Sequence, residues 1–230
     1  MITNNYGVFR GVTTFQKTSE IGGSRYVFVI LGGKQNDNTM PIGGRIKNPF
    51  TGKIFAGDLV EYNIPTDDAE AGATIKVLKT FTVADTVLSD GTEIKIVKNG
   101  YTHRPTIGEV IMKAPNTLTG KGAAYAITNV VENDKEYVVT VATTIGALAK
   151  GDILVNGASA GASVQMLVTK PNAIVDCDYD MIYEPSFDVK GAKYDLTPIY
   201  HGVMWKCRMS ALPKCVEALN KSNVDGWFEI

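Results

Sequence analysis

Short segments rich in β-branched residues, separated by turn dipeptides, are the feature that most constrains how this chain can fold. Such segments cover residues 25–31, 74–83, 92–97, 109–113, 125–131, 136–141, 152–155 and 163–168. Several of them alternate apolar and polar residues, as strands with one buried face do. Turn pairs such as Gly32-Gly33, Asp90-Gly91 and Asn99-Gly100 lie between them. The pattern predicts an all-β fold with a barrel- or sandwich-like core of short antiparallel strands.

A phrase of glycine, an acidic residue and two apolar residues occurs three times, at residues 57–60, 108–111 and 151–154. In each copy we expect the glycine to supply an unusual φ angle and the acidic residue to lead into a buried strand. The phrase is consistent with similar corners in a barrel, although it is too short to establish a sequence repeat.

The chain of 230 residues divides into three segments. Residues 1–50 form an extended N-terminal arm that contains the first strong strand, and residues 51–170 form the β core. Residues 171–230 form a C-terminal segment that is denser in aromatic residues and Met. The one helix that we expect covers residues 212–221, where Pro213 fits a first helical turn.

The charge of the chain excludes some classes of partner. Lys and Arg together number 23 and Asp and Glu 24, which gives a net charge of -1. Because this balance gives no long-range attraction to polyanions, we expect neither a nucleic-acid nor a membrane partner. No apolar run approaches the roughly 20 residues that span a bilayer, and the N-terminus lacks the pattern of a secretory signal. The charged fraction of 20% favours association, so we expect an assembly subunit.

The strongest catalytic motif is residues 157–161, which match the G-x-S-x-G nucleophile elbow around Ser159. That motif needs a strand followed by a helix, whereas a second strand pattern follows here. The base would have to be His103, which we place on a loop, or His201, which lies in an aromatic neighbourhood and reads as structural. We therefore interpret the motif as a small-residue hairpin and predict that the protein is not an enzyme and has no catalytic residues.

Metal and cofactor motifs are similarly weak. Asp176, Asp178 and Asp180 would share one face of a strand, which leaves a Ca²⁺ site open. An EF-hand is excluded because Met181 and Phe187 stand where the loop needs Gly and Glu. The three cysteines lack zinc spacing and read as reduced thiols of a protein made in a cytosol, and no phosphate-binding loop is present. The sequence predicts no bound metal and no cofactor.

The two ends of the chain carry the best candidates for contact with a partner. Aromatic residues near the ends are of the types enriched in interface anchors. We select as partner-binding residues Tyr6, Phe9, Phe15, Trp205, Trp227 and Phe228.

The chain resembles the auxiliary capsid, head-decoration and head-fibre proteins of tailed bacteriophages, particularly those of crAss-like phages. The residues that carry the resemblance are 55–62, 100–114 and 149–155, and the likeness covers about the central half of the chain. The resemblance implies a virion protein that binds the outer surface of the capsid where subunits of the major capsid protein meet. It also implies a homo-oligomer, commonly a trimer, with no catalytic residue. The C-terminal segment exceeds a minimal decoration domain.

Two alternatives stay open. One is a carbohydrate-binding β-sandwich in which Trp205 or Trp227 stacks against a sugar. The other is a head-fibre or tail-associated protein. On the decoration hypothesis, residues 1–50 or the C-terminal aromatic segment dock on the shell while the β core projects outward. Localisation is then the capsid surface, after synthesis in the host cytoplasm.

Overall fold

A computed structural model gives the fold of the chain. It describes residues 12–18, 24–31, 44–46, 52–55, 57–63, 73–175, 179–181, 201–205, 210–217 and 225–228. The described residues form strands in mostly antiparallel sheets with one short helix, so the predicted all-β class is confirmed.

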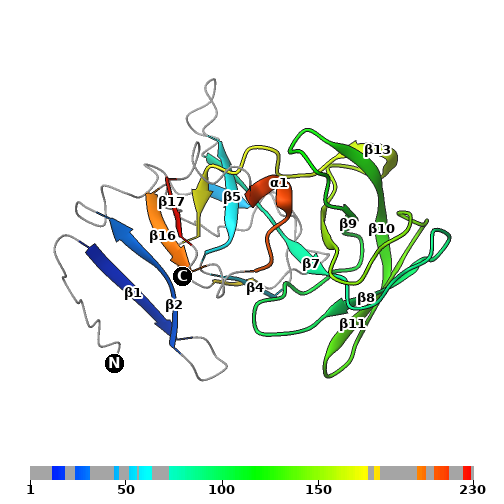
Figure 1. Cartoon of the computed structure of the whole chain (residues 1–230), viewed down its shortest axis with the longest axis horizontal. Helices are drawn as coiled ribbons and strands as arrows, with labels where there is room; N and C mark the ends of the chain where they lie inside the picture. Colours follow the sequence, from blue (N-terminus) through cyan, green and yellow to red (C-terminus); the bar gives the residue numbers. More distant parts are fainter. Residues whose placement is uncertain are drawn as a thin grey trace.

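The largest sheet closes into a barrel, which lies on the right in Figure 1. Its strands follow the order β7-β12-β9-β10-β11-β8, and β13 adds to the end of the long strand β10. A bridge between Val83 and Ile96 joins β7 to β8 at the two ends of this order, and the Ala84 amide donates to the Lys95 carbonyl at 2.8 Å. Closure removes the exposed strand edges that an open sheet would carry. The strands have these bounds: β7 (Thr80–Thr82), β8 (Glu93–Val97), β9 (Val110–Lys113), β10 (Lys121–Glu132), β11 (Glu136–Val141), β12 (Ile153–Asn156) and β13 (Gly161–Gln165).

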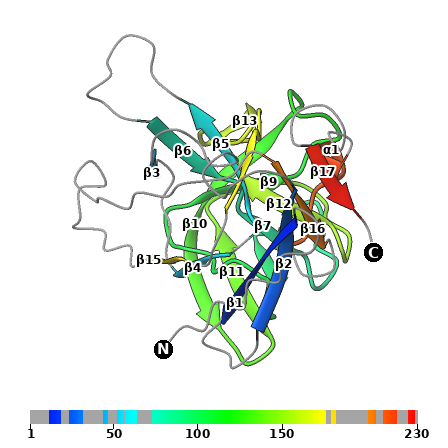
Figure 2. The ribbon, with the colours of Figure 1, turned by 90° about the vertical axis from the view of Figure 1, so that its left-hand side faces the viewer.

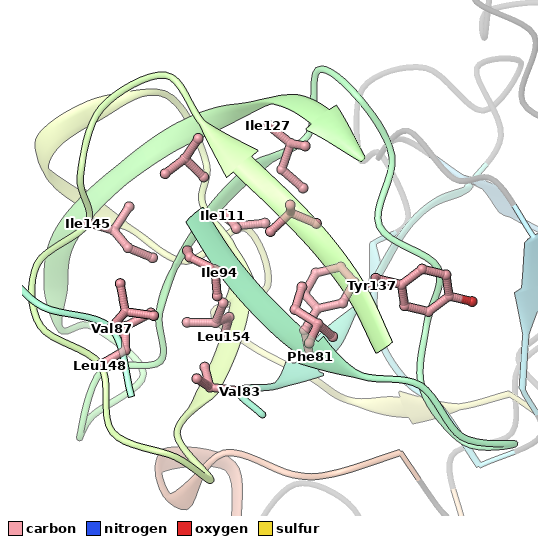
Figure 3. Close-up of a cluster of buried hydrophobic side chains, with 13 residues drawn as sticks. Phe81, Val83, Val87, Ile94, Ile111, Ile127, Tyr137, Ile145, Leu148 and Leu154 are labelled. Carbon is pink, nitrogen blue, oxygen red and sulfur yellow. The ribbon is translucent and has the colours of Figure 1, made fainter. Parts of the chain in front are cut away.

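Apolar side chains fill the barrel, as Figure 3 shows. Alternation selects them: in β8 Ile94 and Ile96 point inward, and in β11 Tyr137, Val139 and Val141 do so. A fully buried aliphatic side chain contributes about 1.5–3 kcal/mol relative to an exposed one, so this interior is the main source of barrel stability. The complete cluster is Phe81, Val83, Val87, Ile94, Ile96, Ile111, Ile127, Tyr137, Val139, Val141, Ile145, Leu148 and Leu154.

Strands β9 and β12 are buried on both faces. Ile111 and Leu154 point into the barrel, whereas their neighbours Met112 and Val155 pack in a second cluster outside it. Helix α1 (Lys214–Glu217) contributes Cys215 to this outer cluster. Burial on both faces explains why these two strands read as continuous apolar runs rather than as alternating patterns.

A second sheet has the order β14-β5-β6-β3 and lies beside the barrel. Its strands are β3 (Gly44–Ile46), β5 (Leu59–Asn63), β6 (Ala73–Val77) and β14 (Ala173–Ile174), and β3 pairs with β6 in parallel. Residues 74–83, predicted as one strand, divide here. They run through β6, cross Leu78 and Lys79, and enter the barrel as β7. The chain changes sheet at Lys79, which is why that residue is buried between them.

A third sheet joins both ends of the chain in the order β1-β2-β16-β17. Its strands are β1 (Val12–Thr18), β2 (Ser24–Leu31), β16 (His201–Trp205) and β17 (Asp225–Phe228), and β16 pairs with β17 in parallel. Figure 2 faces this sheet, with β1 and β2 in front of the barrel strands. A two-stranded ladder joins β4 (Gly52–Ile54) to β15 (Tyr179–Met181).

The structure also describes the other predicted strands and the predicted helix. All eight predicted strand segments contain strands. Strand β5 was expected only from the glycine–acid phrase at residues 57–60, and β1, β3, β4 and β14–β17 were not specified. The predicted helix is present but begins at Lys214, so Leu212 and Pro213 precede it instead of lying in its first turn, and it is described only to Glu217. The division at residues 50 and 170 stays a prediction.

Candidate functional site

The three glycine–acid phrases form the same corner. In each, the acidic residue's amide donates to the carbonyl three residues earlier: Asp58 to Phe55 at 3.0 Å, Glu109 to Thr106 at 3.1 Å, and Asp152 to Ala149 at 3.0 Å. The preceding glycines have φ angles of 90°, 89° and 88°, as the third position of a type II turn requires. The similarity of the three corners is thus confirmed, but only Glu109 and Asp152 lead into barrel strands, β9 and β12. Asp58 leads into β5 of the second sheet, so the expected placement of the corners in a barrel is wrong for the first phrase.

The acidic side chain closes each corner from the other side. A carboxylate oxygen accepts the amide N–H of the first corner residue, at 2.7 Å for Asp58 and Phe55 and at 2.8 Å for Glu109 and Thr106. The third corner repeats this contact at 2.8 Å between Asp152 and Ala149. A short acidic side chain at this position therefore fixes the turn by a charge-assisted hydrogen bond.

Each corner acid also contacts a basic side chain from a different element. Asp58 contacts His103, Glu109 contacts Lys79, and Asp152 contacts Lys113. Burial alone raises the pKa of the Asp152 carboxyl. The hydrogen bonds from Lys113 and from the Ala149 amide outweigh this effect and hold the pKa below its ordinary value. Each corner acid thus closes its own turn and also contacts a residue that is distant in the sequence.

Asp58, His103 and Ser210, which we name the Asp58 cluster, are the described residues that most resemble a catalytic set. They are 3%, 0% and 6% exposed. His103 Nδ1 accepts the Thr80 amide at 3.1 Å, so its Nε2 carries the proton and donates to Asp58 Oδ2 at 2.8 Å. The Ser210 hydroxyl donates to Asp58 Oδ1 at 3.0 Å.

This arrangement differs from a hydrolytic triad. In a triad the serine hydroxyl contacts the imidazole, which removes its proton, and the carboxylate lies behind the imidazole. Here the carboxylate lies between the serine and the histidine, and burial separates all three from solvent. The Asp58 cluster instead ties the β5 corner to the loop before β9 and to the segment before α1. We placed His103 on a loop, which is correct, but its burial was not predicted.

Lys79 and Glu109 form a fully buried ion pair. Lys79 Nζ lies 2.5 Å from Glu109 Oε1, and both side chains are 0% exposed. Burial lowers the pKa of Lys79, while the charge and hydrogen bond of Glu109 raise it in part. Lys79 Nζ also lies 5.5 Å from the centroid of the Phe81 ring. The pair joins the point where the chain enters the barrel to the corner that precedes β9.

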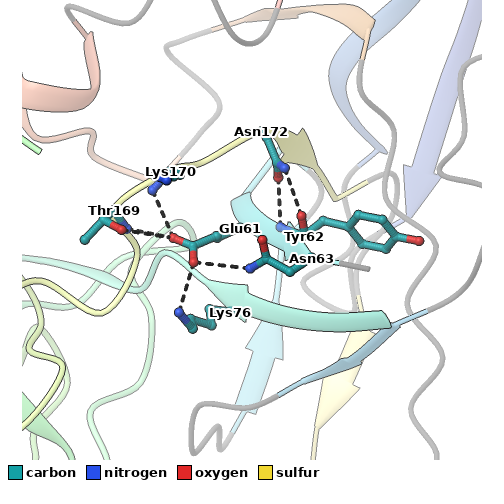
Figure 4. A network of polar contacts seen from close by, with 7 residues as sticks. All are labelled: Glu61, Tyr62, Asn63, Lys76, Thr169, Lys170 and Asn172. Carbon is teal, nitrogen blue, oxygen red and sulfur yellow. Dashed lines mark hydrogen bonds and ion pairs between the residues drawn. The ribbon is translucent and has the colours of Figure 1, made fainter. Parts of the chain in front are cut away.

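Glu61 of β5 holds Thr169 and Lys170, which lie in the segment that leads into β14, as Figure 4 shows. Its Oε2 accepts the amides of Thr169 and Lys170, both at 2.9 Å, and its Oε1 accepts Lys76 Nζ at 2.9 Å. Burial by itself raises the pKa of Glu61. The hydrogen bonds from Lys76, Lys170 and Thr169 lower it more, so the pKa lies below the ordinary value of 4.5.

Glu61→Gln is expected to lower the free energy of unfolding at pH 7 by about 1–3 kcal/mol, because an amide nitrogen cannot accept from the donors around it. A depressed folded-state pKa gives stability that is present above the unfolded-state pKa and is lost as the pH falls through the folded-state value. The loss therefore begins near pH 4.5 and continues below it. Urea unfolding at pH 7 and pH 3 measures the difference, which should shrink at the lower pH. The exposed Glu93→Gln serves as control, and a difference that grows in acid would contradict the assignment.

The chain reverses direction in a hairpin at residues 157–161, as predicted, because residues 156–158 pair with residues 165–167. Asn156 ends β12, Gly161 begins β13, and Gly157 pairs with Met166 across the turn. Ser159 lies on the exposed loop between the two strands, with no helix after it. The structural context of a nucleophile elbow is therefore missing at this position.

The acidic residues considered for calcium are only partly described. Asp180 lies in β15, and Asp176 and Asp178 lie outside the described residues. Within the described ranges, no group of three His, Cys, Asp or Glu side chains could hold a metal ion. A Ca²⁺ site at Asp176, Asp178 and Asp180 therefore stays an open alternative.

Four of the six residues selected for partner contact lie in one sheet. Phe15 is in β1, Trp205 in β16, and Trp227 and Phe228 in β17. Trp205 is the register partner of Phe228, and Met204 that of Trp227. Tyr6 and Phe9 lie outside the described residues. The topology thus brings together aromatic positions from opposite ends of the chain.

Comparison of this chain with models of protein families, with curated proteins and with solved structures gives no match. Among the described residues, no helix has the length and apolar character needed to cross a membrane.

Proposed function

We propose that this protein is a structural virion protein that binds the outer surface of a phage capsid and stabilises or decorates it. The partner is the major capsid protein, and the sheet β1-β2-β16-β17 is the docking element. The observation that carries the proposal is the gathering of Phe15, Trp205, Trp227 and Phe228 in that sheet. Aromatic residues of these types are the usual anchors of protein interfaces.

The edges of this sheet support a docking role. Strands β1 and β17 end the order β1-β2-β16-β17, so each has one pairing neighbour among the described strands. An edge strand offers backbone donors and acceptors to an added strand, and side chains at alternating positions then give specificity. A chain of the shell that extends the sheet beside β17 would therefore also contact the Trp227 position.

The polar interior supports a protein that acts through surfaces. The Asp58 cluster and the Lys79–Glu109 pair are buried, and each acid in them holds a corner. These groups therefore stabilise the fold, which leaves the described titratable clusters without access to a substrate. The barrel, closed and filled with side chains, is a rigid body suited to projection from a shell.

Trp227→Ala is expected to weaken capsid binding roughly tenfold or more, because truncation of a central aromatic anchor typically costs at least about 1.4–2 kcal/mol. Co-sedimentation of the purified protein with capsids that lack it, titrated at fixed salt, measures the affinity. Thermal unfolding of the same variant checks that the sheet remains folded.

The matched control is Leu88→Ser, because Leu88 is an apolar residue of the barrel with 74% of its surface exposed. This variant should bind capsids as the wild type does. Equal binding by Trp227→Ala and the wild type would contradict the docking role of β17, and lost binding by Leu88→Ser alone would move the interface to the barrel. Light scattering tests the accompanying expectation of a trimer.

A further inference from the structure

The sequence contains two Asn-Gly pairs in opposite environments. Asn99, Gly100 and Tyr101 are exposed in the turn between β8 and β9, whereas Asn156 is 7% exposed at the end of β12. An Asn-Gly pair is the one most open to attack of the glycine nitrogen on the asparagine side chain, since glycine offers the least steric hindrance. The fold therefore decides which pair can react.

We propose that Asn99 is a site of spontaneous covalent modification, deamidation through a cyclic imide, and that the fold protects Asn156 from the same reaction. The Gly100 nitrogen, after losing its proton to water, bonds to Asn99 Cγ, and the Cγ–Nδ2 bond breaks with release of ammonia. Water then opens the five-membered ring at either carbonyl, giving aspartate or isoaspartate. The net change is loss of ammonia and gain of water.

The hydrogen bonds of the turn favour the first step at Asn99. Its side-chain oxygen Oδ1 accepts the Tyr101 amide at 2.8 Å and the Thr102 hydroxyl at 3.0 Å. Negative charge develops on this oxygen when the nitrogen attacks, and donors already aimed at such an oxygen lower the barrier. A Cβ built on Gly100 would meet nothing within 4 Å, so space for ring closure is present.

The fold hinders the same reaction at the other pair, Asn156-Gly157. The Gly157 amide donates to the Val110 carbonyl at 2.9 Å, and Asn156 Nδ2 lies 3.4 Å from the same oxygen. A Cβ on Gly157 would lie 2.8 Å from Ala124 Cβ, which shows how closely β10 packs against this site. Ring closure would have to break the hydrogen bond from Gly157 to Val110, which ties the end of β12 to the start of β9.

Modification at Asn99 would change one surface of the barrel. The new carboxylate adds a negative charge next to Lys98, whose Nζ lies 2.7 Å from Glu132 Oε1. Isoaspartate also adds a methylene group to the main chain of the turn that carries the exposed Tyr101. The amount of modified protein would thus rise with the time since the chain was made.

The test is a time course of the intact folded protein at mildly alkaline pH and 37 °C, with peptide mass spectrometry at both pairs. We expect a gain of about 1 Da that accumulates at Asn99 on the order of tenfold faster than at Asn156. In guanidinium chloride the two rates should become similar. Equal rates in the folded protein, no gain at either site, or a faster reaction at Asn156 would overturn the proposal.

Two variants probe the mechanism. Gly100→Ala should slow the reaction at Asn99 on the order of tenfold, because the added methyl hinders ring closure without meeting other atoms. Thr102→Val should slow it roughly twofold to tenfold, whereas Thr102→Ser keeps the hydroxyl and the rate. Equal rates for the Val and Ser variants would overturn the role assigned to the hydroxyl, and an unchanged rate in Gly100→Ala would overturn the cyclic route.

Discussion

Lys79→Met is expected to lower the free energy of unfolding by about 3–5 kcal/mol, since removing one partner of a buried ion pair leaves an uncompensated charge in the interior. Lys79 and Glu109 are both 0% exposed, so water cannot replace the lost ammonium without disrupting the packing around the pair. Methionine keeps most of the volume and the apolar stem, which isolates the effect of charge. Equilibrium unfolding in guanidinium chloride, followed by Trp fluorescence and circular dichroism, measures the change.

A surface ion pair of the same barrel provides the matched control. Lys95 Nζ lies 3.2 Å from Asp85 Oδ2, and these side chains are 40% and 60% exposed. Exposed pairs are typically worth about 0–1 kcal/mol, so Lys95→Met should change stability little. Similar losses for the two variants would show that burial of the Lys79 pair is not the cause.

The double variant Lys79→Met/Glu109→Met separates the charge effect from loss of the side chain. Removing both charges at once leaves no buried ion, so the double variant should be more stable than Lys79→Met alone. Full recovery is not expected, because Glu109 also accepts the Thr106 amide of its corner at 2.8 Å. A double variant less stable than the single variant would contradict the assigned coupling.

Local signals in the sequence were sufficient for the strands of the barrel and for the corners. The alternation in residues 93–97 and 136–141 appears as alternating burial in β8 and β11. The glycine–acid phrases predicted corners because a positive φ at glycine is a property of the turn itself. The hairpin at residues 157–161 could be predicted for the same reason, since two strand patterns flank it closely.

Long-range partners could not be predicted in this way. Lys79 lies 30 residues from Glu109, and Asp58 lies 45 residues from His103 and 152 from Ser210. Nothing near these residues indicates which partner they meet, because the pairing follows from how the sheets pack. The break at Lys79 within residues 74–83 was missed because a strand that changes sheets keeps its β-branched composition.

The aromatic residues of this sheet could be predicted as contact candidates, but their placement in one sheet could not. Residue type indicated Phe15, Trp205, Trp227 and Phe228 one by one as contact candidates. That strands from both ends of the chain join in the order β1-β2-β16-β17 depends on a parallel pairing and on tertiary contacts. Single-residue signals carry no information about such pairings, so the sheet emerged only from the structure.

Asp58→Ala is the second substitution for which we expect a large loss, about 3–5 kcal/mol in the free energy of unfolding. The substitution deprives three buried donors of one acceptor group: the Phe55 amide, His103 Nε2 and the Ser210 hydroxyl. Each buried donor left without its acceptor costs about 1–3 kcal/mol, and part of the cost is relieved by local rearrangement. Denaturant unfolding of the variant and the wild type at pH 7 gives the difference.

Two further variants decide whether the acceptor geometry causes this loss. Asp58→Asn keeps one oxygen for Phe55 and His103, and its amide can donate to the Ser210 hydroxyl oxygen, so it should lose clearly less than Asp58→Ala. Asp152→Ala removes the equivalent residue of the third corner, whose side chain is 23% exposed beside a Lys113 that is 47% exposed. Water can replace those contacts, so a loss of about 1 kcal/mol is expected there. Because all three corners share one turn geometry, equal losses at Asp58 and Asp152 would mean that the turn alone sets the cost. A larger loss at Asp58, together with exchange protection of the His103 Nε2 proton in NMR spectra, would assign the cost to the buried contacts that join the sheets.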